Sequence, residues 1–210
     1  WAEQASLPQS RVVDTSAIFA EALIQVKDTV THSHGPEGEH SHVGTAFTTW
    51  IDLRQAAYQL YAVEKALAPL LEDAARPALA TRAAELRSHL EALDRRLQAV
   101  GTRLAKRPLL GSHPVYQYLA RRYDLNLREV HWEPDTLPDS EALNELKDLL
   151  REHPATVMLW EGNPLEESVA ALKELGIDSL VFAPCGNRPA EGDFLSVMEA
   201  NVSALEGLTD

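Results

Sequence analysis

Two side chains in the second half of the chain stand where metal chemistry could occur. His113 follows a short apolar run at 109–112 and precedes Pro114, a residue that suits the first position of a helix. Glu161 holds an equivalent place, after the apolar run 157–160 and before a second helical pattern. Open α/β sheets bind ligands along the edge formed by the carboxyl ends of their strands, so these two side chains can converge there. An imidazole and a carboxylate together suit a divalent transition-metal ion.

A second concentration of possible ligands lies in residues 31–46. Because this low-complexity tract holds glycine and proline, it predicts a loop without regular structure. Histidine-rich tracts of this kind are typical of metal binding, and imidazole suits zinc, copper, iron and nickel. A solvated loop is the alternative. The four histidines are His32, His34, His40 and His42, with Glu37 and Glu39 among them.

Other candidates carry weaker signals. His131 and Glu133 come at the end of a predicted strand and could reach the same sheet edge, but the sequence favours no ligand role for either. His153 is expected near a helix C-terminus, where a cation is favourable. Cys185 has no companion cysteine, and nothing marks it as a nucleophile.

The elements that position His113 and Glu161 form four strand–helix units. Apolar patterning predicts strands at 109–112, 127–132, 156–160 and 179–183, followed by helices at 115–123, 140–152, 164–175 and 193–205. Short connections between such units imply an α/β fold with a four-stranded, mostly parallel sheet flanked by helices.

The first half of the chain is predicted to be largely helical. Apolar residues at intervals of three and four predict a helix within 49–72 and a longer one over 79–104, which would run about 40 Å. His89 lies beside the stripe of the long helix and is expected to be a packing or surface residue. Residues 11–15 predict a short strand.

Composition narrows the classes of function. The net charge of −13 argues against a nucleic-acid partner, and no apolar run approaches the roughly 18 residues of a membrane span. No signal peptide is present in this sequence. We divide the chain into residues 1–48 with the histidine-rich tract, a helical segment at 49–106, and an α/β lobe at 107–210 that holds the candidate metal ligands.

These motifs, in this order, resemble the zinc/manganese-type solute-binding proteins of bacterial ABC transporters. The segment 112–125 resembles the family's His-x-x-aromatic-x-Tyr motif, Glu133-Pro134 a Glu-Pro-Ser motif, and Trp160-Glu161 a Phe-x-Glu motif. Residues 1–16 resemble a segment late in the family's N-terminal lobe, and 79–104 the helix that joins its two lobes. The resemblance therefore covers nearly the whole chain.

The resemblance implies a metal site between two lobes. It assigns His113 and Glu161 as the ligands of the C-terminal lobe, whereas Thr48 stands where a histidine ligand is expected. The family's first histidine ligand lies in a part of the N-terminal lobe that has no counterpart after Trp1. Either a loop histidine such as His42 substitutes, or the site is incomplete. We expect a fragment or a naturally shortened member, whose metal binding the histidine-rich tract dominates.

The function implied by the resemblance is capture of a divalent metal ion by a binding protein that is not an enzyme. Zinc is expected ahead of manganese, with delivery to the membrane permease of a metal ABC importer in a periplasmic or extracytoplasmic setting. Two alternatives stay open. One is a metal-dependent hydrolase that uses His113 and Glu161 with an open coordination position. The other is a scaffold or interaction domain with a degenerate metal site.

Overall fold

A computed structural model describes residues 7–26, 31–33, 39–41, 44–104 and 106–209. The strands are β1 (Gln25–Val26), β2 (Thr31–Ser33), β3 (Glu39–Ser41), β4 (Gly44–Thr45), β5 (Leu109–Gly111), β6 (Leu127–Glu129), β7 (Val157–Trp160) and β8 (Asp178–Val181). The α-helices are α1 (Leu53–Leu67), α2 (Arg76–Leu104), α3 (Gln117–Tyr123), α4 (Ser140–Glu152), α5 (Glu166–Glu174) and α6 (Phe194–Glu206). Short 3-10 turns are η1 (Gln9–Arg11), η2 (Ala17–Ala22), η4 (Thr49–Ile51) and η5 (Ala68–Leu70).

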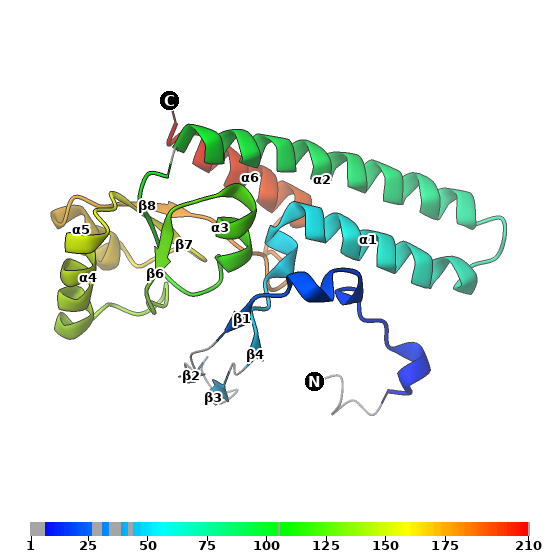
Figure 1. Ribbon diagram of the computed structural model, residues 1–210, viewed down its shortest axis with the longest axis horizontal. Helices are drawn as coiled ribbons and strands as arrows, with labels where there is room; N and C mark the ends of the chain where they lie inside the picture. Colours follow the sequence, from blue (N-terminus) through cyan, green and yellow to red (C-terminus); the bar gives the residue numbers. More distant parts are fainter. Residues whose placement is uncertain (1–6, 27–30, 34–38, 42–43, 105, 210) are drawn as a thin grey trace.

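The second half of the chain forms a four-stranded sheet in the order β6-β5-β7-β8 (Figure 1). Each neighbouring pair is parallel, with Leu110 opposite Arg128 on one side and Met158 on the other. The four strand–helix units predicted from the sequence are thereby confirmed. Their strands all end at one edge of the sheet, which is the edge that carries His113 and Glu161.

Helices cover both faces of this sheet because its central strands are apolar on both sides. Leu109 and Leu159 pack into a core with α2, α3 and α6, whereas Leu110 and Met158 pack into a second core with α4 and α5. Successive residues of a strand point to opposite faces, which explains how strands of three and four residues contribute to two cores. The result is a three-layer α/β arrangement.

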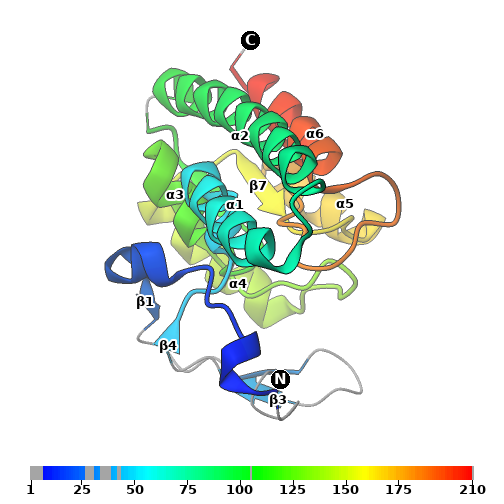
Figure 2. The same cartoon turned by 90° about the vertical axis from the view of Figure 1, so that its right-hand side faces the viewer.

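The long helix predicted at 79–104 is present as α2 and begins three residues earlier, with Pro77 in its first turn. Proline is tolerated there because the first backbone N–H groups of a helix have no partner within the helix. Helix α1 lies beside α2, and both extend beyond the sheet (Figures 1 and 2). Helix α3 approaches α2 closely, since a Cβ added at Gly101 would lie 2.0 Å from the carbonyl oxygen of Tyr123.

Two predictions for the N-terminal part were wrong. The strand predicted at 11–15 is a turn, in which the Asp14 carboxylate accepts hydrogen bonds from the backbone N–H and hydroxyl of Ser16. Such local side-chain bonds compete with strand pairing. The tract 31–46 was predicted to lack regular structure, but β2 pairs with β3 and β4 pairs with β1, both antiparallel.

Candidate metal site

The loops that follow β5, β6 and β7 bring three candidate ligands to one place. Parallel pairing continues past the strand ends: Ser112 N–H donates to the Leu159 carbonyl at 2.8 Å, and Trp132 N–H donates to the Ser112 carbonyl at 2.6 Å. These bonds hold the chain in register up to the candidate residues. His113 follows directly after β5's extension, and Glu161 follows directly after β7.

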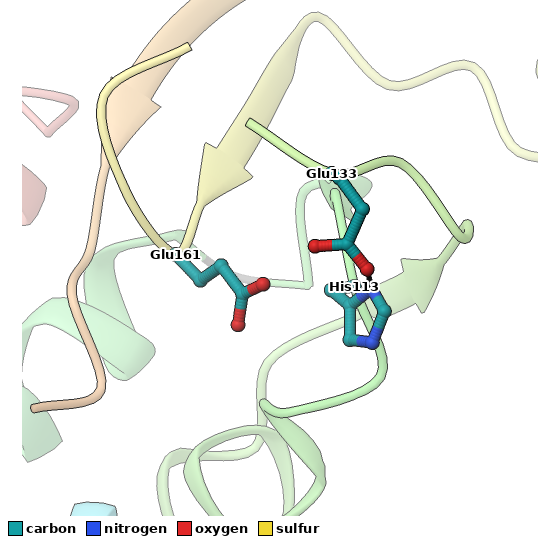
Figure 3. A group of neighbouring side chains, drawn as sticks. All are labelled: His113, Glu133 and Glu161. Carbon is teal, nitrogen blue, oxygen red and sulfur yellow. Dashed lines mark ion pairs between the residues drawn. The ribbon is translucent and has the colours of Figure 1, made fainter. Parts of the chain in front are cut away.

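Glu133 is the third member of the group. Ligand atoms of His113, Glu133 and Glu161 all lie within 4.8 Å of one another. Figure 3 shows the three side chains pointing toward one another. The Nδ1 atom of His113 is 3.5 Å from Oε1 of Glu133. His113 is buried, while the two carboxylates are half-buried. Among the described residues, this group is the one placed to hold a metal ion.

The spacing of the three groups suits a small divalent ion. At the zinc–ligand distances of about 2.0–2.2 Å, two donors in a tetrahedral site lie roughly 3.4 Å apart. The His113–Glu133 pair already has this separation. The 4.8 Å limit of the group requires only small movements of carboxylates that are partly open to solvent.

His113 and Glu161 were predicted as ligands from the sequence, whereas Glu133 was not part of the predicted ligand set. A usable signal was present in Glu129-Val-His-Trp-Glu133, where polar and apolar residues alternate. Val130 and Trp132 pack into the core under α4 and α5. Because residues of an extended segment alternate in direction, Glu129, His131 and Glu133 face the opposite way, toward the turn that carries His113.

A buried tyrosine fixes that turn. Tyr116 precedes α3, its N–H donates to Oε1 of Glu129 at 2.8 Å, and its hydroxyl donates to the Phe182 carbonyl after β8 at 3.0 Å. These two bonds tie the His113 turn to both outer strands of the sheet. Burial raises the pKa of Glu129 to about 7, and the hydrogen bond from Tyr116 opposes the shift. Burial first, and then the charges of Glu161 and Glu129, hold the pKa of Tyr116 well above its usual range.

Thr48 lies beside the same turn. Its hydroxyl donates to the Val115 carbonyl at 2.6 Å, and the Val115 N–H donates to the His113 carbonyl at 2.8 Å. The Thr48 side chain is buried. Thr48 therefore packs the segment before α1 against the candidate site by a hydrogen bond.

The structure describes only part of the histidine-rich tract. His34 and His42 lie outside the described residues. The backbones of His32 and His40 are paired directly across β2 and β3. Cross-strand partners of an antiparallel pair lie on the same face, so the register places these two residues as neighbours.

The remaining candidates have ordinary roles or lie at the rim. His153 caps the C-terminus of α4, as predicted, and its Nε2 is 2.9 Å from the Leu109 carbonyl oxygen. The thiol of Cys185 donates to the Asn187 carbonyl, and burial followed by the charge of Asp193 raises its pKa, which opposes a reactive thiolate. His131 lies nearer the group, with its ring centroid 6.0 Å from that of His113.

Several solved structures share this fold. Similar solved structures are a metal-dependent lipoprotein, YcdH of Bacillus subtilis (20% identity over 78% of this chain, TM-score 0.69), and the Zn(II)-bound ZnuA-like domain of Streptococcus pneumoniae AdcA (21% identity over 88%, TM-score 0.70). Zn(II)-bound AdcA itself is 24% identical over 80% of this chain, with a TM-score of 0.69. The chain spans 64% of the YcdH structure, 68% of the ZnuA-like domain and 38% of AdcA.

The family follows from the sequence. The family model ZnuA, described as zinc-uptake complex component A periplasmic, matches residues 2–207, so the chain belongs to this family. This confirms the resemblance found in the motifs. Comparison with curated proteins found no match. In the part of the chain that the structure describes, no helix has the length and apolar character needed to cross a bilayer.

Proposed function

We propose that this chain binds a divalent transition-metal ion, with zinc as its cargo, at the edge of the sheet where β5, β6 and β7 end. The observation that carries the proposal is the convergence of His113, Glu133 and Glu161 within 4.8 Å. One imidazole and two carboxylates neutralise a divalent charge and match the donors that zinc accepts. Manganese also accepts carboxylates, but a site with a nitrogen donor binds manganese more weakly than zinc.

Two features of the site favour reversible capture. His113 is buried and its surroundings are fixed by Tyr116 and Glu129, so one ligand is held ready. Glu133 and Glu161 are half-buried, which leaves the carboxylates able to close on the ion and to open again. Metal binding competes with protons for the same atoms, so affinity falls as the pH is lowered.

The family and the relatives extend the proposal to transport. Membership in a family of periplasmic zinc-uptake components supports delivery of the bound ion to the membrane permease of an ABC importer, outside the cytoplasm. The Zn(II)-bound state of AdcA and of its ZnuA-like domain supports zinc as the cargo. Binding and release complete this function without a nucleophile, so we propose a carrier and not an enzyme.

Titration calorimetry of the 210-residue chain with zinc tests the proposal. We expect one tight equivalent, and its loss in His113→Ala. His89→Ala is the matched control, because His89 is an exposed histidine on α2. Equal zinc affinity in His113→Ala and in the unmodified chain would contradict the assignment. A competition titration with manganese then measures the order of the two ions.

A further inference from the structure

The three-membered group leaves one position of a tetrahedral metal site to be filled. Structural zinc sites take four protein ligands, whereas sites that exchange or activate a bound molecule keep one position open. The side chains nearest the group therefore decide how firmly the ion is held. Resting on the function proposed above, we infer that His131 is the fourth protein ligand, so that the site draws all four donors from the ends of β5, β6 and β7.

The first argument is the direction of His131. It lies midway between two residues whose contacts are known: Glu129 accepts a hydrogen bond from Tyr116, and Glu133 pairs with His113. The neighbouring apolar residues of this segment pack into the opposite core. Alternation along the extended segment therefore turns His131 toward the turn that carries His113.

The second argument is distance. The rings of His113 and His131 meet edge to face, with an interplanar angle of 83° and centroids 6.0 Å apart. Two imidazoles that share one zinc at about 2.0–2.1 Å per nitrogen have centroids roughly 5 Å apart. The two rings thus need to approach by about 1 Å, a movement that side-chain rotation supplies.

The third argument is exposure to solvent. His131 is exposed, whereas His113 is buried. A rotation about the side-chain bonds of His131 therefore displaces no core residue. One imidazole is held in place and the other closes on the ion from the solvent side, which combines a fixed ligand with a mobile one.

If His131 binds the ion, a threonine at position 48 does not leave the site short of a ligand. The resemblance to the family implies a histidine ligand at this position, but the Thr48 hydroxyl donates a hydrogen bond to the Val115 carbonyl. With His131 in the set, the donors become two imidazoles and two carboxylates. This set needs no ligand from Thr48 or from the histidine-rich tract.

The test compares zinc affinities of His131→Ala, His113→Ala and His89→Ala in the 210-residue chain, by competition with a chromophoric chelator at neutral pH. Removal of an outer-shell partner typically costs 10–100-fold in metal affinity, so loss of a direct ligand should cost roughly 100-fold or more. We expect this loss in His131→Ala and an unchanged affinity in His89→Ala. Because His131 is exposed, the variant should keep the far-UV circular dichroism and melting temperature of the unmodified chain.

The visible absorption of bound cobalt(II) is a second measurement, and it would not change if His131 had only a structural role. Four-coordinate cobalt absorbs visible light far more strongly than five- or six-coordinate cobalt, so His131→Ala should lose intensity at saturating metal as water molecules replace the imidazole and raise the coordination number above four. Zinc affinity within about twofold of the unmodified chain, with an unchanged cobalt spectrum, would overturn the role of His131. In that case a loss of binding in His113→Ala would still uphold the proposed function, whereas unchanged binding in His113→Ala would remove the function itself.

Discussion

The chain offers histidines to a metal in two regions that differ in how they are built. At the sheet edge, His113 is buried, and hydrogen bonds through Tyr116 tie its turn to strands on both sides. In the histidine-rich tract, a three-residue strand pair aligns His32 with His40. The candidate ligands at the sheet edge come from segments far apart in the sequence, whereas the histidines of the tract lie close together in the sequence.

This difference predicts two kinds of metal binding. Ligands held by a packed sheet have lost most of their conformational freedom on folding, so the metal does not have to order them. For the histidine-rich tract the structure describes only two short strands that pair with each other, without a packed sheet around them. We therefore expect the tight equivalent at the sheet edge. This revises the expectation from sequence, in which the tract dominated.

Among the acidic residues, Glu161 should have the largest effect on zinc binding. We expect Glu161→Ala to weaken zinc binding by roughly 1,000-fold, since it removes a charged ligand that β7 holds beside His113 and Glu133. Glu174→Ala, an acidic residue near the end of α5, is the matched control. Isothermal titration with a competing chelator measures both. A loss below tenfold in Glu161→Ala would move the tight site away from the sheet edge.

The next effect concerns folding stability at the sheet edge. Burial raises the pKa of Glu129 from 4.5 to about 7, so its contribution to stability is complete below pH 4.5 and is lost as the pH rises through 7. Glu129→Gln keeps an oxygen acceptor for Tyr116 and removes this titration. The difference in unfolding free energy between the two proteins should shift by on the order of 3 kcal/mol between pH 4 and pH 8, in favour of the variant at high pH.

Urea denaturation at several pH values measures that shift. The histidine and acidic groups elsewhere in the chain are common to both proteins, so their titrations cancel in the comparison. A difference that stays constant from pH 4 to pH 8 would show that the Glu129 carboxyl is not perturbed by burial.

The zinc affinity of a Glu133 variant distinguishes direct binding of the metal from orientation of the His113 ring. If its carboxylate only orients the His113 ring, Glu133→Gln should cost about 10–100-fold in zinc affinity, the range found for outer-shell partners. If it binds the ion directly, as proposed, the loss should approach that of Glu161→Ala. Measuring the two variants side by side ranks the carboxylates. Equal affinity in Glu133→Gln and the unmodified chain would exclude both roles.

The smallest effect on the tight site is expected from the histidine-rich tract. Replacing residues 31–41 by a glycine–serine linker should leave the tight zinc equivalent within about threefold. The variant should lose the weaker equivalents that the tract contributes. A large loss of the tight equivalent would show that the two regions bind one ion together.

The fold could be predicted from the sequence because its apolar periodicity is strong. Helix α4 was predicted at 140–152 and occupies those residues, and each strand of the parallel sheet starts within one residue of its predicted start, although β6 ends three residues earlier than predicted. The N-terminal part was harder. Short strands such as β2 and β3 are set by pairing partners and carry no periodic pattern of their own.

The candidate site was predictable only in part. His113 and Glu161 follow apolar strands directly, so the sequence shows their place at the sheet edge. Glu133 follows β6 by four residues, and its approach to His113 depends on pairing that continues beyond the assigned strand. Tyr116 and Glu129 could not be recognised as partners, because their hydrogen bond joins the turn before α3 to the end of β6, and only the folded sheet brings these two segments together.

The most direct test of the central claim is the position of the bound ion. Crystals of the 210-residue chain with one equivalent of zinc, measured at the zinc absorption edge, locate the metal by its anomalous scattering. We predict a single strong peak within about 2.2 Å of ligand atoms of His113 and Glu161. A peak confined to the histidine-rich tract, with none at the ends of β5 and β7, would contradict the account.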